Sequence, residues 1–141
     1  MSSQETPIAI RTLFDAFNAN DLDRAASVVT SDFELVDVAT GMTFHGPAGL
    51  RLWLEPWLRA APDAKTEITN VIVAGALVAT EHIGRGTHTG PLQSPAGDVP
   101  PTGRSFELRI AEVYELRDGK IDSLRAYYDI ATFLRQLGLM P

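Results

Sequence analysis

Long alternating segments in the second half of the chain constrain its fold most strongly. Apolar and polar residues alternate with a period of two, the pattern of half-buried β-strands. The alternating segments cover residues 64–73, 77–89, 105–117 and 121–129. Gly75-Ala76 and Asp118-Gly119 supply residues suited to hairpin turns between them. The pattern predicts a curved antiparallel sheet.

The first half of the chain favours helices, because its apolar residues recur at helical spacing. Helices are predicted over residues 7–18, over 22–29 and from Gly46-Pro47 onward, with short strands over 33–38 and 42–45. Pro56 falls inside the third helix and should kink or break it, because proline removes one intrahelical hydrogen bond. Residues 90–103 are rich in Pro and Gly and are predicted to form a loop.

Helices followed by a run of antiparallel strands indicate an α+β fold in which a bent sheet wraps around the helices. With 141 residues the chain is long enough for one sizeable core, so we expect a single domain over residues 1–141. A bent sheet of this kind encloses a pocket, and an apolar pocket with a few inward polar groups is the usual small-molecule site. Candidate catalytic and binding residues are therefore the polar residues that share a strand face with apolar ones.

Composition removes several classes of function. The formal net charge of −6 gives no basic surface for nucleic acid, and no apolar run approaches the ~20 residues of a membrane span. The chain has no cysteine and three histidines, so neither a structural metal nor a cofactor is expected. Residues 1–6 lack a signal-peptide pattern, and a cytoplasmic location is predicted.

Glu112 is a carboxylate on an otherwise apolar strand face, which it shares with Ile110 and Tyr114. Burial of a carboxylate raises its pKa toward values useful for general acid–base catalysis. An edge position or a salt bridge is the more ordinary explanation of such a residue. Glu112 is accordingly a candidate substrate-binding residue with both interpretations open.

Asp129 ends the last predicted strand where the final apolar helix begins. As the N-cap of that helix it would accept backbone N–H bonds and stay ionised. As a cavity residue it would be a proton shuttle. Position alone favours the cap.

Two histidines are further candidates. His82 shares its strand phase with Thr80 and Gly84, so it is expected to point inward. A lone inward histidine is more often a hydrogen-bonded core residue, but it could also orient Asp129 or polarise a substrate oxygen. His88 lies where the strand meets the Gly- and Pro-rich loop and is a candidate for substrate binding.

Aromatic residues are numerous enough to form flat walls for a polycyclic or aromatic ligand, although most of them would serve equally well as core. The candidates for such walls are Phe14, Phe17, Trp53, Trp57, Tyr114 and Tyr127.

Several segments of the chain form a recognisable set. They are Phe14, Phe17 and Asn18 to Asp21, Gly46-Pro47, residues 86–90, 100–104 and 118–121, Tyr127-Tyr128-Asp129, and Gln136-Leu137-Gly138. Together they resemble the SnoaL-like polyketide cyclase family of the nuclear transport factor 2-like superfamily, and the resemblance covers nearly the whole chain.

The resemblance implies a cone-shaped α+β barrel with a deep pocket, and an intramolecular aldol ring closure that needs neither cofactor nor metal. It also implies that Asp129 is the pocket aspartate that handles protons, which reverses the preference for a cap. The expected catalytic residues are then Asp129 and His82, acting on a hydrophobic carbonyl compound.

Other functions occur on the same fold, and fold alone does not choose among them. A non-catalytic small-molecule binding domain is the second hypothesis, and a ketosteroid isomerase-like enzyme or a limonene-type epoxide hydrolase is the third. The hydrolase needs an Asp-Arg-Asp relay, for which Arg125 shares a strand phase with Asp129 but no second aspartate is placed beside it. A sheet face left uncovered by helices predicts a homodimer.

Overall fold

A computed structural model describes residues 5–141, which form four helices and eight strands. The first half contains α1 (Ile8–Asn18), α2 (Leu22–Ala26), β1 (Val29–Asp37), β2 (Met42–His45) and α3 (Gly46–Ala60). The second half contains β3 (Lys65–Ala74), β4 (Leu77–Thr87), β5 (Leu92–Ser94), β6 (Gly97–Val99), β7 (Ser105–Arg117), β8 (Lys120–Tyr128) and α4 (Ile130–Gln136).

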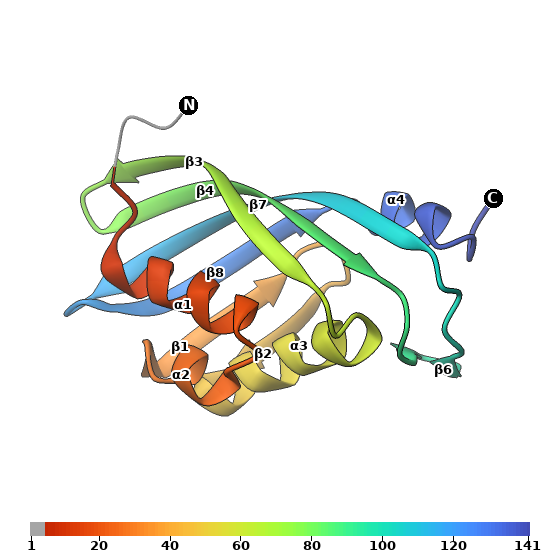
Figure 1. The fold of residues 1–141 in the computed structure, drawn as a ribbon. Helices are drawn as coiled ribbons and strands as arrows, with labels where there is room; N and C mark the ends of the chain where they lie inside the picture. The colour runs from red at the N-terminus through yellow and green to blue at the C-terminus, as the bar shows by residue number, and fades with distance from the viewer. Residues whose placement is uncertain (1–4) are drawn as a thin grey trace.

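Six strands form one curved sheet in the order β2-β1-β8-β7-β4-β3. All neighbours are antiparallel except β1 and β8, which run parallel. The sheet bends around α1 and α3, which cover its concave face (Figure 1). The predicted α+β fold with a curved, mainly antiparallel sheet is therefore confirmed.

The core lies between the concave face of the sheet and the apolar sides of α1 and α3. Alternation along β7 sends Phe106, Leu108 and Tyr114 into this core, while helical spacing in α1 buries Leu13 and Phe14 against it. Each strand thus contributes every second residue to the space where a ligand pocket can form.

Three local expectations were wrong: α2 ends at Ala26 and β1 already begins at Val29, α3 is not broken at Pro56, and residues 90–103 are not all loop. Pro56 lies inside α3, which continues from Gly46 to Ala60. Pro56 cannot donate to the carbonyl of Leu52, four residues earlier, and the helix continues without that one bond. In the predicted loop over residues 90–103, β5 and β6 form a short antiparallel hairpin.

The hairpin is tied to the rest of the fold at both ends. His88 N–H donates to the Arg104 carbonyl at 2.8 Å, and Gly103 N–H donates to the His88 carbonyl at 2.9 Å. Gly90 N–H donates to the carbonyl of Ala60, the last residue of α3, at 2.9 Å. These backbone bonds fix the base of the hairpin against the end of α3.

Among residues 5–141, no helix combines the length and the apolar character needed to span a membrane. Of the N-terminal segment used to predict the absence of a signal peptide, residues 1–4 lie outside the described residues.

Replacement of Leu50 by alanine should test the packing of α3 against the sheet. Leu50 is fully buried, and loss of its side chain leaves a cavity, so the free energy of unfolding should fall by about 2–5 kcal/mol. Leu52→Ala in the same helix, where the side chain is exposed, should change it by less than ~0.5 kcal/mol. Urea unfolding of both variants makes the comparison, and equal losses would contradict the packing described here.

Candidate functional site

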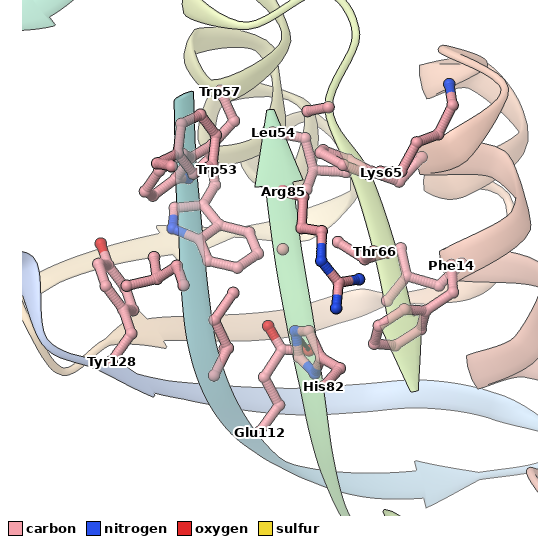
Figure 2. A pocket seen from close by; sticks show the side chains of 17 residues that line it. Phe14, Trp53, Leu54, Trp57, Lys65, Thr66, His82, Arg85, Glu112 and Tyr128 are labelled. Carbon is pink, nitrogen blue, oxygen red and sulfur yellow. Dashed lines mark ion pairs between the residues drawn. The ribbon is translucent and has the colours of Figure 1, made fainter. Parts of the chain in front are cut away.

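An apolar cavity of about 80 Å³ lies between the concave face of the sheet and the helices α1 and α3. Figure 2 shows the side chains around it, with Glu112 and His82 close together on neighbouring strands and the aromatic rings of Trp53 and Trp57 nearby. The apolar lining includes Leu13, Phe14, Phe17, Trp53, Leu54, Trp57, Phe106, Leu108 and Ile110.

Strand register brings the buried polar side chains together. Glu112 on β7 is paired with Thr80 on β4, and residues paired across a sheet project from the same face. His82 lies two residues beyond Thr80, and Tyr114 lies two residues beyond Glu112, so both project from that face as well. The four side chains form one polar cluster in the concave core.

Glu112 is the carboxyl group of this cluster, and its side chain is almost fully buried. Burial, the largest cause, raises the pKa of Glu112 to about 7, assisted by the charge of Asp37 and opposed by a hydrogen bond. That bond comes from Tyr114, whose hydroxyl donates to Glu112 Oε1 at 2.6 Å. Near neutral pH both protonation states of Glu112 are therefore populated.

A chain of hydrogen bonds connects Glu112 to His82. The Tyr114 hydroxyl donates to Glu112, so in its 2.8 Å contact with Thr80 Oγ1 it must accept. The single hydroxyl proton of Thr80 is then used, and Thr80 can only accept from His82 Nδ1, 3.4 Å away. While Glu112 is ionised, the network therefore places the imidazole proton on Nδ1 and leaves the Nε2 lone pair free.

His82 faces Glu112 with that free nitrogen. The distance from His82 Nε2 to Glu112 Oε1 is 4.0 Å, and the ring of Phe14 packs edge-on against the imidazole with its centroid 4.7 Å away. Burial lowers the pKa of His82 to about 4. The imidazole is thus neutral near pH 7, and the contact is not an ion pair.

A second polar group of the site, Asp37, was not singled out from the sequence. Its Oδ2 accepts from Trp53 Nε1 at 2.9 Å and from the Tyr128 hydroxyl at 2.7 Å, and both donors line the cavity. Asp37 shares its strand phase with the apolar residues Phe33 and Leu35. The signal that identified Glu112, a carboxylate on a buried stripe, was therefore present here too.

Asp129 does not lie in the cavity, and the expectation that its carboxylate faces an enclosed pocket is wrong. It is exposed and is the N-cap of α4, where its side chain accepts from the backbone N–H groups of Ala131 and Thr132. Bonds from Thr132, the largest cause, lower its pKa and keep it ionised. Asp129 shares the phase of the outward-facing residues of β8, whereas Tyr128 points inward.

Other expected positions divide between the cavity and its surroundings. Phe14, Phe17, Trp53, Trp57 and His82 line it as predicted. Tyr114 is fully buried behind Glu112.

Two expected positions, Tyr127 and His88, lie outside the cavity lining, which corrects the sequence-based assignment. Tyr127 is exposed on the outer face of β8, and Arg125 shares its phase, so no Asp-Arg-Asp relay forms in the cavity. His88 is buried outside the cavity lining, where its Nδ1 accepts from the N–H of Thr102 at 3.1 Å.

Within residues 5–141, no three His, Cys, Asp or Glu side chains group as metal ligands. A comparison with curated proteins found no match. Solved structures of several proteins are similar to this chain.

IdmH of Streptomyces antibioticus, a candidate polyketide cyclase, is 29% identical over 92% of this chain and 96% of its own, with a TM-score of 0.78. A candidate SnoaL-like polyketide cyclase from Jannaschia sp. CCS1 is 19% identical over 99% and 100%, with a TM-score of 0.82. A Catenulispora acidiphila protein solved with trimethylamine is 23% identical over 97% and 96%, with a TM-score of 0.80.

The chain has the ketosteroid isomerase-like α+β fold, the description given to the Catenulispora structure. A family model for SnoaL-like polyketide cyclases matches residues 8–137. The chain belongs to the SnoaL-like polyketide cyclase family.

The buried carboxyl of Glu112 should make stability depend on pH. The native state retains a proton on Glu112 that the unfolded chain releases above pH 4.5. The contribution of Glu112 to the free energy of unfolding is therefore fully present below pH 4.5 and is lost as pH rises toward 7. Relative to Glu112→Gln, the wild type should lose about 3 kcal/mol over this interval in urea unfolding.

The difference between the two proteins cancels the contribution of His82, whose lowered pKa reduces stability below pH 6.5 in both. Parallel stability curves for wild type and Glu112→Gln would show that Glu112 titrates normally.

Proposed function

We propose that this protein catalyses proton transfer at an acidic carbon, leading to an intramolecular aldol cyclisation of a polyketide-like substrate, with Glu112 as the general acid–base group. The observation that carries the proposal is the position of Glu112, a hydrogen-bonded carboxyl with a pKa near 7 at an apolar cavity. A base is most effective when its pKa lies near the working pH.

The proposed reaction needs one proton to leave and return. The Glu112 carboxylate takes a proton from a carbon flanked by carbonyl groups, and the electron pair of that C–H bond passes into an enolate. The enolate carbon attacks a second carbonyl of the same molecule, forming the C–C bond and an alkoxide. The carboxylic acid of Glu112 returns its proton to the alkoxide, which completes the balance without an external reagent.

Neighbouring groups support this role. Tyr114 fixes the orientation of the carboxyl group through its 2.6 Å bond. With Glu112 ionised, His82 presents an unprotonated Nε2 toward the same oxygen, so it can accept a hydrogen bond from a substrate hydroxyl. The apolar walls exclude water and hold the substrate folded, which supplies much of the rate of an intramolecular step.

The cavity also limits what can bind. Its volume of about 80 Å³ is below the roughly 300–1,000 Å³ of typical ligand pockets, so a multi-ring ligand must displace wall side chains. Trp53 and Trp57, both only partly buried, offer flat apolar surfaces for an aromatic ring. An aryl compound bearing a 1,3-dicarbonyl unit fits these requirements.

We still predict that the reaction needs no cofactor or metal and that the protein is cytoplasmic. A non-catalytic binding domain is the alternative, and it differs from the enzyme in having no use for a tuned carboxyl group.

Glu112→Gln should abolish proton transfer, because a glutamine amide cannot take the carbon-bound proton. We expect the exchange of the C2 hydrogen of naphthoylacetone for deuterium, followed by NMR in D₂O and corrected for the buffer rate, to fall by roughly 10²–10⁴-fold relative to the wild type.

The matched control is Asp129→Asn, which removes the charge of an exposed carboxyl but retains a good capping side chain. It should exchange at the wild-type rate. A different result would be that naphthoylacetone binds to the wild type, which quenching of tryptophan fluorescence would show, and yet exchanges no faster than in buffer. That combination would identify a binding domain instead of an enzyme. Equal exchange by Glu112→Gln and wild type would remove Glu112 from the mechanism.

We also propose that the protein forms a homodimer through the outer face of the sheet, which α1 and α3 leave uncovered (Figure 1). The register aligns Ile72, Ala79 and Val113 across this face with Arg125 at the end of the row, and it places Ala111 and Tyr127 beside Glu81 in a neighbouring row. Ile72 and Tyr127 are exposed. Small and apolar residues at the centre of an open sheet face suit a self-complementary contact.

Sizing by light scattering should give twice the chain mass of 15.3 kDa for the wild type. Val113→Lys places a charge at the centre of the contact and should give the mass of one chain. Thr43→Lys, on the edge strand β2 and outside the proposed contact, should leave the dimer intact. A wild-type protein that is monomeric at micromolar concentration would refute the dimer.

A further inference from the structure

We propose that Asp37 is a positioning residue that controls the protonation state of Glu112 from across the sheet while fixing one wall of the cavity. The catalytic significance of this control rests on the role proposed for Glu112. The physical claim does not, because it concerns two carboxyl groups whose ionisation is measurable without a substrate.

The first observation is the register of three strands. Asp37 on β1 pairs with Ala126 on β8, and Ala126 pairs with Glu112 on β7. Paired residues project from the same face, so the two carboxyl groups lie in one row on the concave side with only Ala126 between them. The row continues to Thr80 on β4, the hydroxyl that bonds to Tyr114.

The second observation is burial. Asp37 is 3% exposed, Ala126 is fully buried and Glu112 is 5% exposed. The methyl group of Ala126 contributes no polar atom that could screen one carboxyl from the other. Two strand spacings separate the residues by roughly 10 Å, and at that distance water at a surface would screen the interaction, whereas a buried row retains it.

The third observation is the set of partners of Asp37. Trp53 Nε1–H and the Tyr128 hydroxyl donate to Oδ2, and the N–H of Thr40 donates to Oδ1 at 3.1 Å. All three partners are donors, which is the arrangement that an ionised carboxylate requires. Asp37 therefore provides a fixed negative charge and, through the same bonds, holds the indole of Trp53 and the ring of Tyr128 in place.

The charge acts on Glu112 in one direction. A negative charge in the same row disfavours the ionised form of Glu112, and so adds to the effect of burial, which is larger. The other titratable groups at the cavity are either neutral or paired with other partners. Tyr114 donates to Glu112, His82 is neutral, the Tyr128 hydroxyl is bonded to Asp37, Lys65 Nζ donates to the Asn18 carbonyl, and Arg85 is paired with Glu67 and Glu107.

The experiment is a titration of the Glu112 side-chain carboxyl by ¹³C NMR in the wild type and in Asp37→Asn. Asparagine keeps the shape and one acceptor oxygen but removes the charge, so the titration midpoint of Glu112 should fall by roughly one pH unit. Asp32→Asn is the matched control on the same strand, because its carboxyl is exposed, and it should leave the midpoint unchanged.

A midpoint that is the same in wild type and a folded Asp37→Asn overturns the proposal. If Asp37→Asn does not fold, the titration of the wild type still tests the proposal. The titration midpoint of Glu112 in the wild type must lie well above the ordinary value of 4.5 for a glutamate carboxyl, and a midpoint at that value overturns the proposal as well.

The outcome is separable from that of the proposed function. An unmoved midpoint together with loss of exchange in Glu112→Gln refutes the influence of Asp37 and leaves Glu112 as the proton-transfer group. A shifted midpoint together with full exchange in Glu112→Gln supports the coupling between the two carboxyls and refutes the catalytic role.

Discussion

The pairing of β8 with both β1 and β7 is the constraint on which the rest of the structure depends. The last strand of the chain runs parallel to the first and antiparallel to β7, so it joins the helical first half to the long hairpins of the second. The same pairing fixes which side chains share a row. A shift of β8 by one residue would turn Ala126 and Tyr128 to the outer face and would separate Asp37 from its Tyr128 partner.

Much of the fold follows from local patterns. Period-two alternation gives β3, β4, β7 and β8, and helical spacing gives α1 and α3. The parallel contact of β1 with β8 could not be predicted, because the two strands lie more than eighty residues apart and alternation says nothing about partners. Pro56 did not mark a break, because a helix held on both sides of a proline can continue without the one hydrogen bond that is lost.

The site was predictable in part, and its main error has a simple origin. Phase analysis placed Glu112 and His82 on buried faces, and both line the cavity. Position alone favoured Asp129 as the cap of the final helix, which the structure shows it to be, but the resemblance to the family reversed that preference. Asp37 went unnoticed although it has the phase of Leu35. The hydrogen bonds from Tyr114 and Tyr128 depend on tertiary contacts that no local pattern contains.

The attachment of the β5–β6 hairpin has a mechanical consequence. Thr89 and Gly90 both donate their backbone N–H groups to Ala60, the residue at which the helix carrying Trp53 and Trp57 ends. Gly90 approaches the Arg59 carbonyl so closely that no side chain fits there. Any side chain at position 90 would therefore force the base of the hairpin away from the C-terminal end of the helix that carries Trp53 and Trp57.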